Sequence, residues 1–360
     1  MAQVVDPAFW RGRRVLVTGH TGFKGAWLTL WLTELGARVT GFADGVPTEP
    51  SLFELARVAE GIDDVRGDVR DPDAVARAVA GHEVVIHMAA QALVRRSFRD
   101  PRETYETNVM GTVNVLEAAR QSESVRAIVN VTSDKCYDNR EQGRPFVEDD
   151  PKGGHDPYSS SKGAAELVAD AYQRSFFGPA PDGPRLGSGR AGNVIGGGDW
   201  SEDRLIPDIM RGAVAGEEIR VRNPTAVRPW QHVLNPLAGY LELAQALVAS
   251  PEAAGGWNFG PALDDVQPVK WITDRIAELW PGELRWVVDP GPHPHEAHFL
   301  ALDSTKARER LGWTPGWGLD EALQRTVEWY RAVRDGASAR AMTRERIQAY
   351  TNAASTLPQR

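Results

Sequence analysis

The sequence has one cysteine, Cys136, no long apolar run and no excess of positive charge. A single cysteine excludes an internal disulfide and a multi-cysteine zinc site, and it favours a reducing compartment. No apolar stretch nears the ~20 residues of a membrane span, and the N-terminus lacks the apolar core of a secretion signal. The 41 basic and 49 acidic residues give a net charge of −8, so no overall field attracts nucleic acid or anionic lipid. We therefore expect a soluble cytoplasmic protein in which a local cluster of cations holds any anionic ligand.

The first half of the sequence alternates between strand and helix patterns. The 360 residues, 42% hydrophobic and 25% charged, are typical of a globular protein rather than a disordered or fibrous one. Short apolar runs predict strands at 14–18, 38–43, 64–69, 84–88 and 127–131. Helical patterns lie at 25–35, from 71 onward and at about 101–120. This rhythm predicts an α/β fold with a Rossmann-type, doubly wound parallel sheet.

The second half is less regular. A turn-rich break at 177–184 precedes several turns that contain Gly and Pro, and amphipathic patterns return at 236–248 and 320–331. We predict a Rossmann domain over 1–185 and a smaller mixed domain over 186–345, with some of its segments returning to the first domain. The last residues, 346–360, are predicted to be a loosely held tail.

A glycine-rich loop joins the first predicted strand to the first predicted helix. Gly19, Gly22 and Gly25 lie within TGHTGFKG, residues 18–25. Glycine permits a tight turn, close approach of backbone N–H groups to a pyrophosphate and close packing of the helix on the strand. The helix N-terminus adds a partial positive charge. A purely structural loop is the alternative, but the strand–loop–helix context favours a dinucleotide site.

The end of the second predicted strand does not decide between NAD and NADP. An acidic residue there would bind the adenosine ribose of NAD, but the position is Ala43, with Asp44 one residue later. We expect NAD and leave NADP open, because Lys24 or a nearby arginine could meet a 2′-phosphate. Asp68, after the third strand, is a candidate for the adenine amino group or, alternatively, a capping residue of a turn.

Tyr158 and Lys162 lie four residues apart behind Asp156-Pro157, which is a good helix start, so one helix face presents both side chains. A nearby lysine lowers the cost of a tyrosinate and makes Tyr158 a usable base. An exposed helix start is the alternative for this common spacing. Together with the glycine loop and Ser133, which follows the fifth strand, the order resembles the short-chain dehydrogenase/reductase superfamily.

The residues beside Ser133 narrow the resemblance to the extended, NAD-dependent epimerase/dehydratase branch. Its sugar-nucleotide 4,6-dehydratases carry an acid and a base there, mostly Asp-Glu, whereas this sequence has Asp134 and Lys135. Asp-Lys followed by Cys-Tyr is similar to the members that act on CDP-glucose. Other matching strings are HMAAQALVRRS at 87–97, NVMGTVNVLEA at 108–118, GGHDPYSSSKGAAELV at 153–168, RAGNVIGGGDW at 190–200, DRLIPD at 203–208 and RPWQHVLNPLAGYL at 228–241.

The resemblance implies conversion of CDP-glucose to CDP-4-keto-6-deoxyglucose and water, with a tightly bound NAD that is regenerated at each turnover. Oxidation at C4 makes the C5 proton acidic, elimination expels the C6 hydroxyl, and a hydride returns to C6. The resemblance assigns removal of the 4-hydroxyl proton to Tyr158, helped by Ser133. It makes Lys135 the base that removes the C5 proton and Asp134 the acid that protonates the C6 hydroxyl, so the pKa of Asp134 must be raised. Lys135 must be neutral to act as a base; alternatively, it is an orienting cation.

The same resemblance supplies the expected binding residues. Cofactor contacts are expected from Gly19, Thr21, Gly22, Phe23, Lys24, Gly25, Asp68, Val69, Ala89, Ala90, Asn108, Tyr158 and Lys162. Substrate contacts are expected from Gln91, Ser97, Arg190, Asn193, Arg204, Arg228 and His232. Arginine suits a diphosphate because its planar fork binds two oxygens. An ordinary surface ion pair is the alternative for each of these arginines.

The histidine-rich segment HPHEAH at 293–298 is not expected to hold a metal, because Pro294 interrupts a helical face and the family uses no metal. The resemblance further implies a homodimer or higher homo-oligomer through two helices per subunit. Neither nucleic acid nor a membrane is an expected partner.

Three other functions stay open. The protein could be a C4 epimerase, although an epimerase would have no use for Asp134 and Lys135. It could be a dehydratase for another nucleotide sugar. It could also be a cofactor-sensing module, although such a module would have no reason to keep Ser133, Tyr158 and Lys162.

Overall fold

A seven-stranded parallel sheet forms the centre of the computed structural model, which describes residues 5–178, 180, 182–291 and 298–356. The strand order is β11-β6-β5-β4-β1-β2-β3, and every neighbouring pair is parallel. The strands are β1 Arg14–Thr18, β2 Arg38–Ala43, β3 Asp63–Arg66, β4 Val84–His87, β5 Ala127–Val131, β6 Arg185–Ala191 and β11 Gly255–Phe259. The predicted Rossmann-type sheet is confirmed, although the third strand begins and ends earlier than the expected 64–69.

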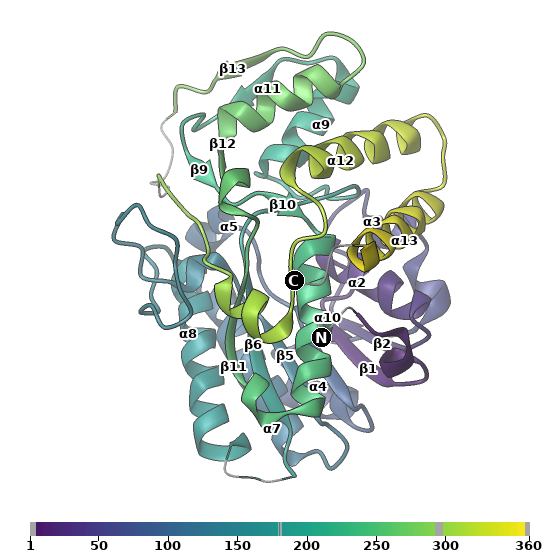
Figure 1. Ribbon diagram of the computed structural model, residues 1–360, viewed down its shortest axis with the longest axis vertical. Coiled ribbons are helices and arrows are strands. Elements are labelled where there is room, and N and C mark those ends of the chain that lie inside the picture. Colours follow the sequence, from purple (N-terminus) through teal and green to yellow (C-terminus); the bar gives the residue numbers. More distant parts are fainter. Residues whose placement is uncertain (1–4, 179, 181, 292–297, 357–360) are drawn as a thin grey trace.

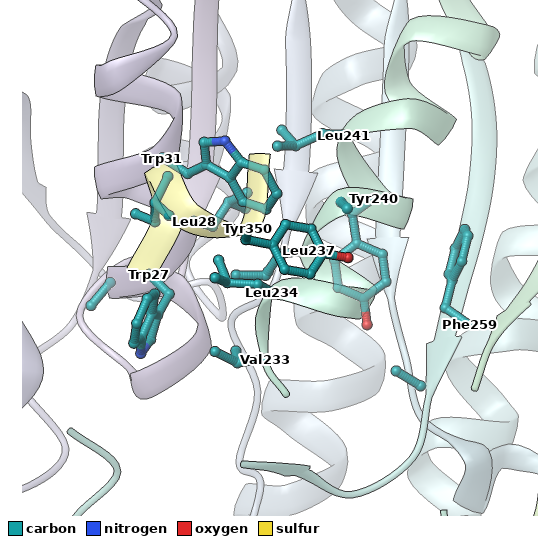
Figure 2. Packing of buried hydrophobic residues seen from close by; sticks show 14 of the residues in the cluster. Trp27, Leu28, Trp31, Val233, Leu234, Leu237, Tyr240, Leu241, Phe259 and Tyr350 are labelled. Atoms are coloured by element: carbon teal, nitrogen blue, oxygen red, sulfur yellow. The ribbon is translucent and has the colours of Figure 1, made fainter. Parts of the chain in front are cut away.

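Helices cover both faces of the sheet because its central strands bury side chains on both sides. Val15 and Val17 of β1 belong to one apolar cluster, with α2 (Phe23–Glu34) and α10 (Leu234–Ala249). Leu16 belongs to another. The helices on that second face are α4 Pro72–Val79, α7 Gly111–Gln121 and α8 Pro157–Tyr172. Figure 2 shows how α2 and α10, which are far apart in the sequence, pack together through Trp31 and Leu241.

The remaining elements are short or belong to the second half. The other helices are α1 Pro7–Trp10, α3 Leu52–Leu55, α5 Val94–Arg99, α6 Pro101–Tyr105, α9 Leu205–Ala215, α11 Val269–Leu279, α12 Leu319–Arg334 and α13 Ala339–Thr356. The 3-10 and π turns are η1 Val58–Gly61, η2 Glu106–Met110, η3 Asp134–Cys136, η4 Gln173–Phe177, η5 Pro251–Ala253, η6 Leu263–Asp265 and η7 Ala307–Leu311. Three small strand pairs are β7 Val194–Ile195 with β10 Gln231–His232, β8 Ile219–Val221 with β13 Trp286–Val288, and β9 Val227–Arg228 with β12 Gln267–Pro268. Figure 1 shows α9, α11 and α12 gathered with β9, β12 and β13 at one end of the molecule.

Two sequence predictions need correction. The expected helix at 101–120 is divided into α6, the π turn η2 and α7. The expected loose tail at 346–360 is wrong for 346–356, because these residues continue α13. Ile347 and Tyr350 are buried, and the Tyr350 ring packs edge-on against Trp31 of α2. The domain limits 1–185 and 186–345 stay predictions; β11 belongs to the central sheet although it lies in the second half.

Candidate active site

A cavity of about 280 Å³ lies where the segments that follow β5 and β6 meet α9 and β8. In doubly wound folds, ligands bind outside the carboxyl ends of the parallel strands. The residues predicted to be catalytic that line this cavity are Ser133, Asp134, Lys135 and Tyr158. Of the predicted substrate-binding residues, Asn193, Arg204 and Arg228 line it. The cavity therefore brings the two groups together from distant parts of the sequence.

Helix α8 begins as its sequence predicts. The Asp156 side chain accepts a hydrogen bond from the Ser159 backbone N–H at 2.9 Å, and Pro157 occupies the first turn. Lys162 is buried and donates to the Val131 carbonyl at 3.5 Å. Burial lowers the pKa of Lys162 to about 8. Burial raises the pKa of Tyr158 to about 12, against a hydrogen bond to Ser133 and the charge of Arg204, so burial outweighs the lowering expected for a catalytic tyrosine.

The turn after β5 holds a buried acid. Ser133 donates to Asp134 Oδ1 at 2.9 Å and accepts from the Lys135 backbone N–H at 3.3 Å. Asp134 is 2% exposed, and within the described part of the chain its Oδ2 has no hydrogen-bond partner. Burial raises the pKa of Asp134, although Lys135, Ser133 and Arg228 oppose the shift. The pKa of Asp134 is thus shifted in the direction that a general acid requires, and its role as the acid stays a prediction.

The glycine loop has the shape that a dinucleotide pyrophosphate requires. Gly19 has φ +73°, which favours glycine, and a Cβ at Gly25 would lie 2.1 Å from the Gly19 carbonyl oxygen. Gly22 is the N-cap of α2 and contributes no side-chain capping bond. Thr21 turns its hydroxyl away to the Gly45 carbonyl at 2.6 Å. Backbone N–H groups at the start of α2 are therefore left for an anion, which fits the phosphates of NAD.

The other predicted cofactor residues form a frame around this loop. The Ala89 backbone N–H donates to Thr18 Oγ1 at 3.1 Å, and Ala90 follows it in the same segment. Asn108, in the π turn η2, donates to the Gln91 carbonyl and to Ser161. The Val69 carbonyl accepts from Asn114. Asp68 forms an ion pair with Arg70, whose hydrogen bonds lower the pKa of Asp68.

Lys24 does not lie where a 2′-phosphate contact would place it. Its Nζ is 3.4 Å from the Tyr240 hydroxyl, and its side chain lines the same cavity as Tyr158. Burial lowers the pKa of Lys24 to about 7, and the charges of Lys162 and Arg204 add to the shift. The expectation that Lys24 could select NADP is therefore corrected, because the side chain points to the catalytic residues.

Four predicted substrate residues are not among the residues that line the cavity. Arg190 is 4% exposed and pairs with Glu166. His232 is buried beside Trp27 and accepts from the Leu234 backbone N–H; burial lowers its pKa to about 3. The other two brace nearby backbone: Gln91 bonds Leu93 and Thr104, and Ser97 accepts from the Tyr158 backbone N–H. The expected direct contact from Arg190 is corrected, because its three guanidinium nitrogens all donate to groups within the fold. The contact expected from His232 stays a prediction.

Three further arginines line the cavity and were not predicted: Arg95, Arg220 and Arg222. Arg95 and Arg222 both pair with Asp203, at 3.3 and 3.4 Å. Arg95 lies within the matched string at 87–97, close in sequence to Gln91, so the string could have marked it as a candidate substrate contact. Arg220 and Arg222 lie on and beside the short strand β8, where no motif marks them.

Within the described ranges, no three or more His, Cys, Asp or Glu side chains come together as a possible metal site. Of the histidine-rich segment, His293, His295 and Glu296 lie outside those ranges, whereas His298 lies inside. Of the helices in those ranges, none has the length and apolar character needed to cross a membrane.

Comparison with known proteins identifies the family. A family model described as GDP-mannose 4,6 dehydratase matches residues 16–326. The chain belongs to this family. It is 51% identical to the CDP-glucose 4,6-dehydratase of Salmonella typhimurium, over 97% of this chain and 99% of that protein. It is 30% identical to the dTDP-glucose 4,6-dehydratase of Streptomyces niveus, over 88% and 93% of the two chains. The crystal structure of a dTDP-glucose 4,6-dehydratase from Streptomyces venezuelae with NAD bound matches with a TM-score of 0.76 and 26% identity, over 89% of this chain and 98% of that one.

Proposed function

We propose that the protein is a CDP-glucose 4,6-dehydratase, a hydro-lyase that forms CDP-4-keto-6-deoxyglucose and water. The observation that carries this proposal is the group of side chains in one cavity: Tyr158 and Ser133 together with Asp134 and Lys135. A C4 epimerase needs only a hydroxyl pair and a lysine, whereas elimination of water needs an added acid and base. The 51% identity to a CDP-glucose 4,6-dehydratase supports CDP-glucose as the substrate.

NAD is the proposed cofactor, and bound NAD would accept a hydride from C4 of the hexose and return it to C6. The loop of Gly19, Gly22 and Gly25 and the start of α2 would hold its pyrophosphate. Lys162, buried on α8 beneath the cavity, would hold the other end. The NAD bound to the Streptomyces venezuelae relative supports this choice.

The protein's own side chains carry the proton steps. Tyr158 takes the proton of the 4-hydroxyl while Ser133 holds the oxygen, and the charge of Arg204 favours the tyrosinate. Lys135 removes the C5 proton, exchanges it with solvent and then supplies a proton to C5 when the hydride returns to C6. Asp134, whose pKa burial raises, gives its proton to the leaving C6 hydroxyl, which departs as water. Tyr158 then holds one proton more and Asp134 one fewer, so exchange with solvent resets the site.

Five arginines of the cavity lining would hold the diphosphate of the nucleotide sugar. They are Arg95, Arg204, Arg220, Arg222 and Arg228. Because the chain has a net charge of −8, a local cluster must supply the attraction. Charge-assisted bonds from arginine to phosphate are among the stronger hydrogen bonds in proteins.

We also propose that the protein forms a homodimer through the helices around α8. Tyr105 at the end of α6, Met110 in η2 and Leu167 of α8 are 40%, 50% and 61% exposed. Apolar side chains gathered on one surface favour burial against a second copy. A Leu167→Glu variant should dissociate in light scattering, and a wild-type protein that is monomeric would contradict the proposal. The cytoplasmic location stays a prediction from the single cysteine.

Incubation with CDP-, dTDP-, UDP- and GDP-glucose, followed by mass spectrometry, tests the function. We expect CDP-glucose to lose one water and the other sugars to react more slowly. Unchanged mass with an inverted C4 would indicate an epimerase. Cofactor binding without any reaction would indicate a sensing module.

A further inference from the structure

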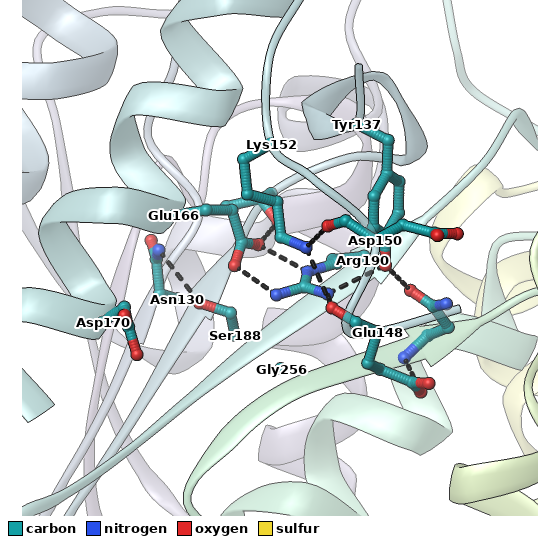
Figure 3. A network of polar contacts seen from close by, with 12 residues as sticks. Asn130, Tyr137, Glu148, Asp150, Lys152, Glu166, Asp170, Ser188, Arg190 and Gly256 are labelled. Atoms are coloured by element: carbon teal, nitrogen blue, oxygen red, sulfur yellow. Dashed lines mark hydrogen bonds and ion pairs between the residues drawn. The ribbon is translucent and has the colours of Figure 1, made fainter. Parts of the chain in front are cut away.

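Glu166 and Arg190 form a buried ion pair behind the catalytic turn, shown in Figure 3. Arg190 Nε and Nη2 donate to the two carboxylate oxygens of Glu166 at 2.9 and 2.7 Å. The side chains are 5% and 4% exposed. Burial alone would raise the pKa of Glu166, but the charge and hydrogen bonds of Arg190 hold this pKa below its usual value. The pair is therefore ionised and fully engaged inside the protein.

The same two side chains reach the turn that carries the acid and the base. Thr132 Oγ1 donates to the Glu166 carboxylate. Arg190 Nη1 donates to the Tyr137 hydroxyl at 2.8 Å and to the Glu148 carbonyl at 2.9 Å. Thr132 directly precedes Ser133, and Tyr137 closes the same turn. The ion pair thus holds both ends of the segment that contains Asp134 and Lys135.

Glu166 also belongs to the helix that carries the tyrosine and the lysine. It lies four residues after Lys162 and eight after Tyr158 on α8, so the three side chains share one helix face. The carboxylate of Glu166 therefore links the catalytic face of α8 to the turn after β5, through its hydrogen bond from Thr132. Arg190, Glu166 and Tyr137 themselves are not among the residues that line the cavity.

The proposed reaction needs this junction because one hexose ring reacts at both segments. Tyr158 and Ser133 act at C4, whereas Lys135 and Asp134 act at C5 and C6. The turn η3 has only three residues, so its position relative to α8 depends on what it packs against and bonds to. A displacement of about 1 Å at a reacting group can cost a factor of about 100 in rate.

We propose that Glu166, Arg190, Thr132 and Tyr137 act as a positioning clamp that sets Asp134 and Lys135 relative to Tyr158 and Lys162. The clamp rests on the proposed dehydratase function. It makes Arg190 a positioning residue rather than a diphosphate contact, and it explains why a charged pair is kept in a place where burial is costly.

Removal of Arg190 would leave Glu166 buried and unpaired and would endanger folding, so smaller changes at both ends of the turn are the better test. Thr132→Val removes the hydroxyl bond to Glu166, and Tyr137→Phe removes the hydroxyl that meets Arg190. Matched controls lie far from the cavity. Thr343→Val removes a buried acceptor of the Trp329 indole N–H, and Tyr350→Phe removes an acceptor of the Gly316 N–H.

For Thr132→Val and Tyr137→Phe we expect kcat on CDP-glucose to fall about tenfold or more, with KM within about twofold. Their melting temperatures should fall no further than those of the controls, whose kcat should stay near wild type. Thr132→Ser, which restores a hydroxyl, should recover most of the rate. Wild-type kcat in both clamp variants would overturn the proposal and leave the pair a structural one.

Hydrogen exchange separates failure of the clamp from failure of the proposed function. In both clamp variants, exchange should rise together in peptides covering 132–137 and 157–166, and neither control should produce this pattern. If wild-type protein removes no water from CDP-glucose, the proposed function fails, but this coupled exchange still tests the clamp. Exchange that rises in only one of the two segments would overturn it.

Discussion

The two walls of the cavity differ in how they are assembled. The catalytic wall is built from three compact pieces of sequence: the glycine loop at 18–25, the turn after β5 and the first turns of α8. The nucleotide wall collects five arginines from four places in the sequence: Arg95, Arg204, the pair Arg220 and Arg222 at β8, and Arg228. Local spacing places side chains on one helix or turn, whereas only the tertiary fold decides which distant arginine faces a cavity. Catalytic residues that lie close together in the sequence can therefore be predicted more securely than a binding surface built from distant arginines.

The largest effect is expected on the catalytic wall, from Tyr158→Phe. This change removes the proton acceptor and leaves the ring in place, so kcat should fall about 100- to 10,000-fold, while CDP-glucose still binds. Steady-state kinetics and calorimetric titration measure the two quantities. The control is Tyr172→Phe at the other end of α8, which removes a hydroxyl that donates to Glu117 of α7. Near-normal turnover by Tyr158→Phe would mean that Tyr158 belongs only to a helix start and is not the proton acceptor.

A smaller effect, mainly on binding, is expected from the nucleotide wall. Arg204→Gln removes a charged group that lines the cavity, and a charge-assisted bond is worth about 1.5–3 kcal/mol. KM for CDP-glucose should therefore rise about 10- to 100-fold, and kcat should fall less, through loss of the charge that favours the Tyr158 tyrosinate. His232→Phe should lower the melting temperature and leave KM unchanged, because this ring is buried between Trp27 and Trp317. Equal rises in KM for the two variants would favour the sequence-based prediction that His232 contacts the substrate.

The smallest effect is expected away from both walls, at Glu242 of α10. This side chain is 7% exposed, and in the described part of the chain its Oε2 has no partner. Burial raises its pKa well above the usual value. Above pH ~4.3, where an unfolded glutamate ionises, the folded chain holds a proton that the unfolded chain has released. Stability therefore falls as pH rises, by up to about 1.4 kcal/mol per pH unit, until the folded pKa is reached.

Glu242→Gln removes this dependence by replacing the carboxyl with a neutral group of similar shape. Denaturant unfolding should find the variant more stable than wild type at pH 8 and equally stable near pH 4. Equal stabilities at both pH values would mean that Glu242 is ionised with an adequate partner in the folded chain.

Much of the fold follows from the sequence because its signals are local. Continuous apolar runs marked β1, β4 and β5, and Asp156-Pro157 marked the start of α8. The α13 helix was missed because its polar sequence has few apolar positions, and only packing of Tyr350 against Trp31 makes those positions a core face. The π turn η2, which interrupts an otherwise helical pattern at 106–110, has no sequence signal of its own.

The site shows the same division. Ser133, Asp134, Lys135 and Tyr158 line the cavity as their spacing and the family resemblance predicted. Arg190 has the same side chain as Arg228 and lies just as close in sequence to a cavity loop. It nevertheless turns to the opposite side, because Glu166 of α8 lies there to receive it. A partner so distant in the sequence cannot be inferred from the residues around Arg190.

The central claim is that Asp134 and Lys135 form an acid–base pair for elimination. The most direct test is Lys135→Met with CDP-glucose in deuterated water. We expect wild type to incorporate deuterium at C5 and to release water. The variant should still oxidise C4, which the absorbance of reduced cofactor would show, yet neither exchange C5 nor expel water. Exchange of C5 by Lys135→Met at the wild-type rate would show that Lys135 is not the C5 base and only orients other groups as a cation.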